Sequence, residues 1–278
     1  MNLLILGSTG FLGSKVLDAF KNRNTIYKGF RTNFDNVELP DVTLNDLDVA
    51  KIENFIENNK VDFIIYALNS YFKDPTKRNL LEMEKVNFQF PKEILEILNR
   101  NKLSTQLLYF TSYFDDVNVP KESSGYALTK KMFTDYLKLN VHISNYKLLK
   151  ISDTFGTWDN RSKIFNFILK NILRQKKITL QNPKGVVNLI YVDRLMEKTK
   201  DFLIDDNKFD HLLNKYSITT ENLCKLIDKI YHGKLVELEK YFFVEERFSN
   251  LDLNYGFEIV DEISNVINNE EYIKFLKN

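Results

Sequence analysis

The chain begins Met1-Asn-Leu-Leu-Ile-Leu-Gly7-Ser-Thr-Gly10-Phe-Leu-Gly13. The apolar run Leu3–Leu6 predicts a buried β-strand, and Ser14–Phe20 predicts the helix that follows it. In a dinucleotide-binding loop of this form, the first glycine permits a tight turn and the second lets the backbone approach a pyrophosphate. The third lets the helix pack closely on the strand. N–H groups at the start of such a helix attract phosphates. The N-terminus therefore predicts a dinucleotide-binding loop.

Composition and charge exclude several classes of protein. The chain has 278 residues, 44% of them hydrophobic, which suffices for one large or two small domains. Lys and Arg (39) nearly balance Asp and Glu (38), so we expect neither nucleic acid nor a membrane as partner. The single cysteine, Cys224, indicates a reducing compartment. Without a long apolar run or a secretory signal, the sequence predicts a cytoplasmic protein, and no motif indicates a metal site.

Strand and helix patterns alternate along the first half of the chain. Val61–Leu68 and Leu107–Ser112 predict buried strands. Apolar spacing over Pro75–Asn101 and Gly125–Leu139 predicts helices, the first of them long and kinked at Pro91. The alternation predicts parallel crossover units, and therefore an α/β fold with a doubly wound parallel sheet of the Rossmann type.

The pattern changes after about residue 155. Shorter pieces follow, among them a strand at Lys177–Leu180, a helix opened by Thr219 and a final helix near Asp261–Ile267. They predict a smaller C-terminal α+β lobe. We therefore expect a dinucleotide-binding domain over residues 1–155, to which some later segments return, and a substrate-binding lobe over residues 156–278.

A tyrosine and a lysine four residues apart form the second informative motif. In Tyr126-Ala-Leu-Thr-Lys130 the two side chains share one face of a predicted helix. A cation near a phenol lowers the tyrosine pKa, so Tyr126 can exchange a proton with a carbonyl or alcohol oxygen. Ser112 ends a predicted strand at the sheet edge where such folds bind ligands, and its hydroxyl can hold the same oxygen. The pattern predicts a catalytic set of Ser112, Tyr126 and Lys130.

Together these motifs resemble the extended branch of the short-chain dehydrogenase/reductase family, whose members act mostly on nucleotide-activated sugars. The matching segments extend over nearly the whole chain and are Gly7–Gly13, Val61–Asn69, Val86-Asn87, Phe110–Ser112, Tyr126 with Lys130, Lys150–Gly156, Asn188–Asp193 and Asn254–Phe257. The resemblance implies a nicotinamide cofactor bound by Gly7, Thr9, Gly10, Phe11, Leu12, Gly13, Arg31, Ala67, Asn69, Thr111, Tyr126 and Lys130.

Departures from the family pattern narrow the expected reaction. Sugar-nucleotide 4,6-dehydratases of the family carry Asp-Glu directly after the catalytic Thr, whereas this chain has Tyr113-Phe114. The bifunctional epimerase-reductases place a Cys near that loop and a His further on. Here Cys224 lies deep in the second lobe, and the three histidines match no such motif. The remaining Ser/Tyr/Lys set suffices for carbonyl reduction.

Arg31 indicates which nicotinamide cofactor is used. It ends a second predicted strand, Thr25–Arg31, where an acid would accept from the ribose 2′-OH of NAD and an Arg suits the 2′-phosphate of NADP. No acid follows until Asp35. We therefore expect NADPH, which arrives reduced and leaves oxidised, so that the reaction is a net reduction.

The sequence analysis thus predicts NADPH-dependent reduction of a keto group, at C4, on a nucleotide-linked deoxysugar in surface polysaccharide synthesis. Such 4-keto reductases include enzymes of the CDP-paratose/abequose and dTDP-4-dehydrorhamnose type. An epimerase that retains NAD and a non-catalytic dinucleotide sensor stay open as alternatives. A homodimer also stays open, with the predicted helix Gly125–Leu139 as its contact. The residues expected to bind the substrate are Ser70, Asp153, Arg161 and Lys163.

Overall fold

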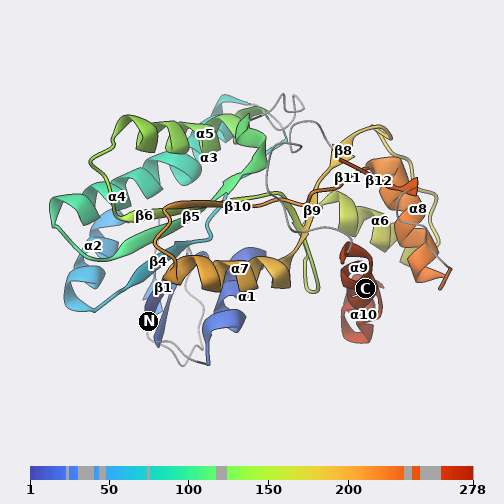
Figure 1. Ribbon diagram of the computed structural model, residues 1–278, viewed down its shortest axis with the longest axis horizontal. Coiled ribbons are helices and arrows are strands. Elements are labelled where there is room, and N and C mark those ends of the chain that lie inside the picture. Colours follow the sequence, from blue (N-terminus) through green and yellow to red (C-terminus); the bar gives the residue numbers. More distant parts are fainter. Residues whose placement is uncertain are drawn as a thin grey trace. The chain divides into compact units, whose positions relative to one another are not determined.

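The computed structural model describes residues 1–22, 25–30, 41–43, 48–73, 76–116, 124–234, 240–244 and 258–277 (Figure 1). The chain forms two compact units. The first comprises Met1–Lys150 and Thr199–His211, and the second comprises Ile151–Lys198 and Leu212–Asn278. A segment late in the sequence therefore belongs to the first unit.

A seven-stranded sheet forms the centre of the first unit, with strand order β10-β6-β5-β4-β1-β2-β3. The order runs outward from β1 in both directions, and β1 pairs in parallel with both β2 and β4. The predicted Rossmann-type α/β fold is confirmed. The strands are β1 (Asn2–Leu6), β2 (Thr25–Phe30), β3 (Asp41–Thr43), β4 (Phe63–Tyr66), β5 (Gln106–Ser112), β6 (Tyr146–Ile151) and β10 (Phe209–Leu212).

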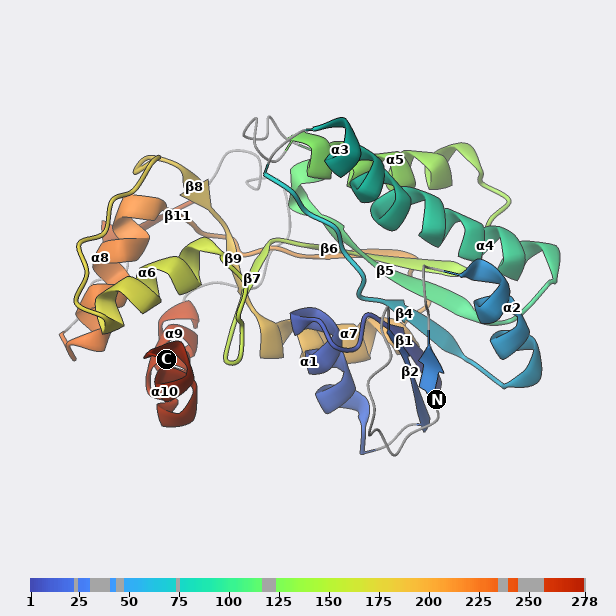
Figure 2. The same cartoon turned by 180° about the vertical axis from the view of Figure 1, so that it is seen from behind.

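Helices cover both faces of this sheet (Figures 1 and 2). The first face carries α2 (Val49–Asn58), α3 (Lys77–Glu84), α4 (Phe90–Arg100) and α5 (Ser124–Leu139), and the other carries α1 (Phe11–Phe20) and the second half of α7 (Val192–Ile204). Side chains alternate along a strand, so Leu4 and Leu6 pack under the first group of helices. Leu3 and Ile5, which are fully buried too, face the other way.

The predicted single helix over Pro75–Asn101 is wrong in one respect, because a π-helical turn, η1 (Lys85–Gln89), separates α3 from α4. In a π-turn each N–H bonds five residues back, which displaces backbone carbonyls from the regular pattern. Here the Val86 and Asn87 carbonyls accept hydrogen bonds from the buried hydroxyls of Tyr66 and Tyr109. Pro91 lies in the first turn of α4, which continues directly from η1, and it has no N–H to donate to a carbonyl of that turn.

The second unit has an α+β arrangement. Its strands β8, β11 and β12 form one small sheet, and β7 and β9 pair in parallel. The elements are β7 (Asp153–Phe155), α6 (Ile164–Leu173), β8 (Val186–Val187), β9 (Leu189–Tyr191), β11 (Ser217–Thr219), α8 (Thr220–Tyr231), β12 (Phe242–Phe243), α9 (Ile259–Ile267) and α10 (Glu270–Lys277).

Two sequence predictions in this unit had different outcomes. The helix start at Thr219 is confirmed, because its hydroxyl caps α8 by accepting from the Asn222 N–H at 3.2 Å. The strand predicted at Lys177–Leu180 is wrong, since these residues form an irregular and largely exposed segment. The two β-favouring residues there, Ile178 and Thr179, lack a partner strand, and local propensity alone does not make a strand.

A buried carboxyl group lies on α9 of the second unit. Glu262 is 6% exposed, and its Oε1 lies 3.6 Å from Nε of Arg194. Burial raises the pKa of Glu262 from about 4.5 to about 7, and Arg194 offsets only part of this rise. The folded unit therefore binds this proton more tightly than the unfolded chain does.

This proton makes the stability of the second unit depend on pH. The stabilisation from Glu262 is complete below about pH 4.5 and is lost as the pH rises through about 7. We expect a loss of about 3 kcal/mol over that range, and a flatter dependence in Glu262→Gln. Urea unfolding followed by fluorescence of the single tryptophan, Trp158, which packs on Tyr272 in the same unit, measures it. Asp261→Asn on the exposed side of α9 is the control; equal pH dependence in Glu262→Gln and the unmodified protein would contradict the assignment.

Candidate active site

The three glycines of the N-terminal loop have different structural roles. Gly7 has φ +85°, a conformation that L side chains rarely adopt, and an added Cβ would lie 3.0 Å from the Leu68 N atom. A Cβ on Gly13 would lie 2.1 Å from the Gly7 carbonyl oxygen, so this position requires glycine for packing. A Cβ on Gly10 would meet only the Gly7 oxygen, at 3.4 Å. The internal packing of the chain therefore does not require glycine at position 10.

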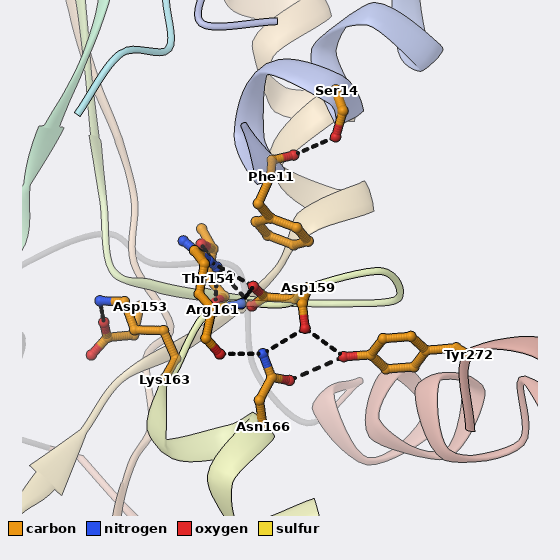
Figure 3. A network of polar contacts seen from close by, with 9 residues as sticks. All are labelled: Phe11, Ser14, Asp153, Thr154, Asp159, Arg161, Lys163, Asn166 and Tyr272. Atoms are coloured by element: carbon orange, nitrogen blue, oxygen red, sulfur yellow. Dashed lines mark hydrogen bonds and ion pairs between the residues drawn. The ribbon is translucent and has the colours of Figure 1, made fainter. Parts of the chain in front are cut away.

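The surroundings of Gly10 fit the diphosphate of a dinucleotide. Gly10 is the N-cap of α1 with extended φ and ψ of −76° and 165°, and no side chain caps the helix. The Ser8 hydroxyl is buried and has no hydrogen-bond partner within the described part of the chain. A helix N-terminus without a capping side chain, beside an open backbone position, is what an anionic ligand requires. Ser14, one turn on, bonds back to the Phe11 carbonyl at 2.9 Å (Figure 3).

Ser112, Tyr126 and Lys130 all lie in the first unit. Ser112 is the last residue of β5, and Tyr126 and Lys130 lie in the first two turns of α5. The Lys130 side chain is 4% exposed, and its Nζ donates to the Phe110 carbonyl at 3.0 Å while lying 6.0 Å from the centre of the Tyr126 ring. The Ser112 hydroxyl accepts from the Phe114 N–H at 3.3 Å. Its own hydrogen can then be donated to another acceptor.

The buried amide of Asn87, in η1, connects two segments at this site. Its Oδ1 accepts from the Ser70 N–H at 3.0 Å, and its Nδ2 donates to the Ser70 carbonyl at 2.8 Å. The same Nδ2 donates to the Thr129 hydroxyl at 3.1 Å, which in turn donates to the Tyr126 carbonyl at 2.9 Å. The loop after β4 and the start of α5 are therefore held together through one side chain.

The loop after β4 brings further predicted residues to this edge of the sheet. Ala67 borders Gly7, since its carbonyl carbon would lie 3.1 Å from a Cβ added to that glycine, and the exposed Asn69 follows. Ser70 is 6% exposed, and its backbone is bound by Asn87. Thr111 is 1% exposed, next to Ser112.

Two tyrosines at the site were not predicted from the sequence. The Tyr71 ring packs edge-on against Tyr126, with ring centres 5.6 Å apart. The Tyr109 ring lies beneath Lys130, whose Nζ is 4.2 Å from the ring centre. Tyrosines at 66 and 109, within strands predicted to be buried, were the available signal, since a buried hydroxyl needs a hydrogen-bond partner.

Two aromatic rings occupy the positions where a dehydratase would have its acid pair. Tyr113 and Phe114 stack with ring centres 4.3 Å apart, and Tyr113 is 4% exposed. Neither side chain is a carboxyl group that could protonate and deprotonate a sugar carbon.

The other predicted substrate-binding residues lie in the second unit, where each is ion-paired (Figure 3). Arg161 donates from Nε and Nη2 to the two carboxylate oxygens of Asp159 at 2.7 and 2.8 Å, and from Nη2 to the Thr154 carbonyl at 2.9 Å. Lys163 pairs with Asp153 at 3.2 Å. The Asp159 carbonyl also accepts from the Tyr272 hydroxyl of α10 at 3.0 Å.

Arg31 and Asn254–Phe257 lie outside the described residues. No group of His, Cys, Asp or Glu among the described residues could hold a metal ion. None of the helices in the described part of the chain is long and apolar enough to cross a membrane.

The glycine loop generates a prediction with a matched control. Gly13→Ala should lower the free energy of unfolding by about 2 kcal/mol or more, because the backbone of Gly7 must move. Gly10→Ala should change it by less than about 0.5 kcal/mol, since its Cβ makes an ordinary contact. Urea unfolding of the two variants followed by far-UV circular dichroism tests this difference. Equal losses of unfolding free energy in the two variants would contradict the different packing of Gly13 and Gly10.

Comparison with solved structures agrees with the fold described above. A UDP-glucose 4-epimerase from Thermotoga maritima, solved with UDP-glucose, superposes over 100% of both chains with a TM-score of 0.77 at 16% identity. The dTDP-glucose 4,6-dehydratase from Bacillus anthracis, solved with NAD, does so over 100% of both chains with a TM-score of 0.73 at 14% identity. At these identities the likeness shows a shared fold. The model of the NAD dependent epimerase/dehydratase family matches residues 3–198, and the chain therefore belongs to that family.

Proposed function

We propose that this protein is an oxidoreductase that uses NADPH to reduce a keto group, at C4, on a nucleotide-linked deoxysugar. The observation that carries the proposal is the combination of Ser112, Tyr126 and Lys130 in the unit that holds the glycine loop, with aromatic residues in place of a dehydratase acid pair. A proton donor beside a nicotinamide is sufficient for carbonyl reduction. The product would serve surface polysaccharide synthesis.

The residues of the first unit have separate roles in this reaction. The backbone N–H groups at the start of α1 would hold the diphosphate, and Lys130 would hold the nicotinamide ribose. When bound, the reduced nicotinamide supplies the hydride. Tyr126 protonates the oxygen of the keto group, and the nearby ammonium of Lys130 favours the phenolate that Tyr126 becomes. Ser112, whose oxygen already accepts from Phe114, orients the keto group by donating its hydroxyl hydrogen.

A nucleotide-sugar epimerase is the second candidate. It is favoured by the fold match to a UDP-glucose 4-epimerase from Thermus thermophilus solved with NAD, which covers 99% of both chains with a TM-score of 0.72 and 14% identity. An epimerase removes and returns hydride at one carbon, so it must start with the oxidised cofactor and keep it. A reductase must take up the reduced cofactor and release the oxidised one.

Cofactor preference separates the two candidates. We expect the purified protein to bind NADPH more tightly than NADH, because Arg31 suits a 2′-phosphate, and to contain no stoichiometric NAD. Fluorescence titration with each reduced cofactor measures the preference. Gly10→Ala should weaken binding of both about tenfold or more while the protein stays folded, because its Cβ occupies the approach of the diphosphate. Tighter binding of NADH would remove the NADPH assignment.

Substrate turnover tests the reaction itself. NADPH oxidation should be observed with one or more 4-keto deoxysugars linked to CDP, GDP, UDP or dTDP. Conversion of a nucleotide sugar without added reductant, by protein that already contains NAD, would establish the epimerase instead. Binding of NADPH without turnover of any such substrate would indicate a dinucleotide sensor.

Tyr126→Phe tests the proton donor. It should leave NADPH affinity nearly unchanged and lower kcat about 10²- to 10⁴-fold, the range for loss of general acid catalysis. Tyr136→Phe is the matched control on the same helix, because its hydroxyl bonds to Glu96, away from Lys130. Near-normal turnover in Tyr126→Phe would exclude Tyr126 as the proton donor.

A further inference from the structure

The environment of Lys130 shows how its ammonium group is held. Lys130 is almost fully buried, and its Nζ donates to the Phe110 carbonyl at 3.0 Å. The same Nζ lies 4.2 Å from the centre of the Tyr109 ring, well within the distance for a cation–π interaction. A buried ammonium loses hydration, and an aromatic face together with a carbonyl replaces part of it.

The Tyr109 ring is itself fixed in place. The residue is fully buried, and its hydroxyl donates to the Asn87 carbonyl at 2.7 Å. Its ring packs against Phe133 and Tyr66, with ring centres 4.4 and 5.5 Å away. Asn87 is the residue that ties the β4 loop to α5. One end of Tyr109 is therefore anchored in η1, while its face contacts Lys130.

We propose that Tyr109 is a positioning residue, whose ring face holds the protonated Lys130 at a fixed place beside Tyr126. The consequence for catalysis rests on the proposed function, in which Lys130 favours the phenolate of Tyr126. Among the contacts described for this ammonium, two are with titratable groups, Tyr109 of β5 and Tyr126 of α5, and the ring of Tyr66 of β4 packs at a tilt against Tyr109. The hydroxyl of Tyr109 donates a hydrogen bond to the π-turn, and the face of its ring contacts the Lys130 ammonium.

The two parts of Tyr109 can be separated at one position. Tyr109→Phe removes the hydrogen bond to Asn87 and keeps the ring, whereas Tyr109→Leu removes both. Tyr66→Phe is a matched control, because it removes the other hydroxyl bond to the π-turn, at Val86, and leaves the contact between Lys130 and Tyr109. A merely structural role for Tyr109 predicts that Tyr109→Leu lowers stability and leaves the environment of Lys130 as it is in Tyr109→Phe.

Nuclear magnetic resonance of lysine-labelled protein without cofactor reads the contact directly. Protons beside an aromatic face are shifted upfield by the ring current, so the ε-CH₂ signal of Lys130 should stand apart from those of other lysines. Lys130→Met identifies the signal by its loss. We expect the shift to persist in Tyr109→Phe and Tyr66→Phe and to disappear in Tyr109→Leu. An unshifted Lys130 signal in the unmodified protein would overturn the proposal, even if Tyr109→Leu does not fold.

The pH dependence of kcat tests the effect on Tyr126. Reduction requires the protonated phenol, so activity falls as pH rises through its pKa. Less precise placement of Lys130 raises that pKa. In Tyr109→Leu the alkaline limb should therefore move up by about one pH unit, and kcat should fall about tenfold. Tyr109→Phe should restore the profile. If Lys130→Met leaves the profile unchanged, the proposed function fails; if Lys130→Met moves it and Tyr109→Leu does not, only the role of Tyr109 fails.

Discussion

The hydrogen bonds of one buried amide determine the geometry of the candidate site. Asn87 uses its oxygen and both hydrogens on the Ser70 backbone and the Thr129 hydroxyl, and is fully buried. An aspartate there has no hydrogen to donate, and an aliphatic residue would leave the Ser70 N–H and carbonyl unpaired, at a cost of about 1–3 kcal/mol each. The β4 loop and α5 can thus keep their spacing only with an amide between them.

The π-turn that carries Asn87 is held by two further buried hydrogen bonds. η1 shifts the helix register by one residue, and the Tyr66 and Tyr109 hydroxyls satisfy the carbonyls that this shift displaces. These two tyrosines are register partners on adjacent parallel strands, so both reach the same turn. Tyr109 therefore takes part in the strand pairing, in the hydrogen bond to the π-turn and in the contact with Lys130.

Much of this arrangement could be predicted from the sequence, and the remainder depends on contacts between distant residues. The Rossmann-type fold follows from Leu3–Leu6, the glycine spacing and the alternation of strands and helices, because these are local patterns. The π-turn was not predictable, since Pro75–Asn101 has ordinary helical spacing on either side of it. β10 joins the sheet beside β6 only after the chain has built part of the second unit. The sequence analysis predicts that later segments return to the first domain, but periodicity does not identify which strand does so.

The ion pairs of the second unit constrain how charged residues there can serve a substrate. Asp159 is 1% exposed, and its carboxylate is bound by Arg161 through two hydrogen bonds. Moving Arg161 onto a phosphate would leave a buried carboxylate without that partner, which is strongly unfavourable. Arg161 thus helps to stabilise the folded unit through its pairing with the buried carboxylate of Asp159. Arg194 lies 3.6 Å from Glu262, but burial raises the pKa of that carboxyl to about 7, so Glu262 can take up a proton if Arg194 moves away. Because a paired cation presents little uncompensated charge to a ligand, a substrate site built from these residues would depend more on shape and on hydrogen-bond donors than on net charge.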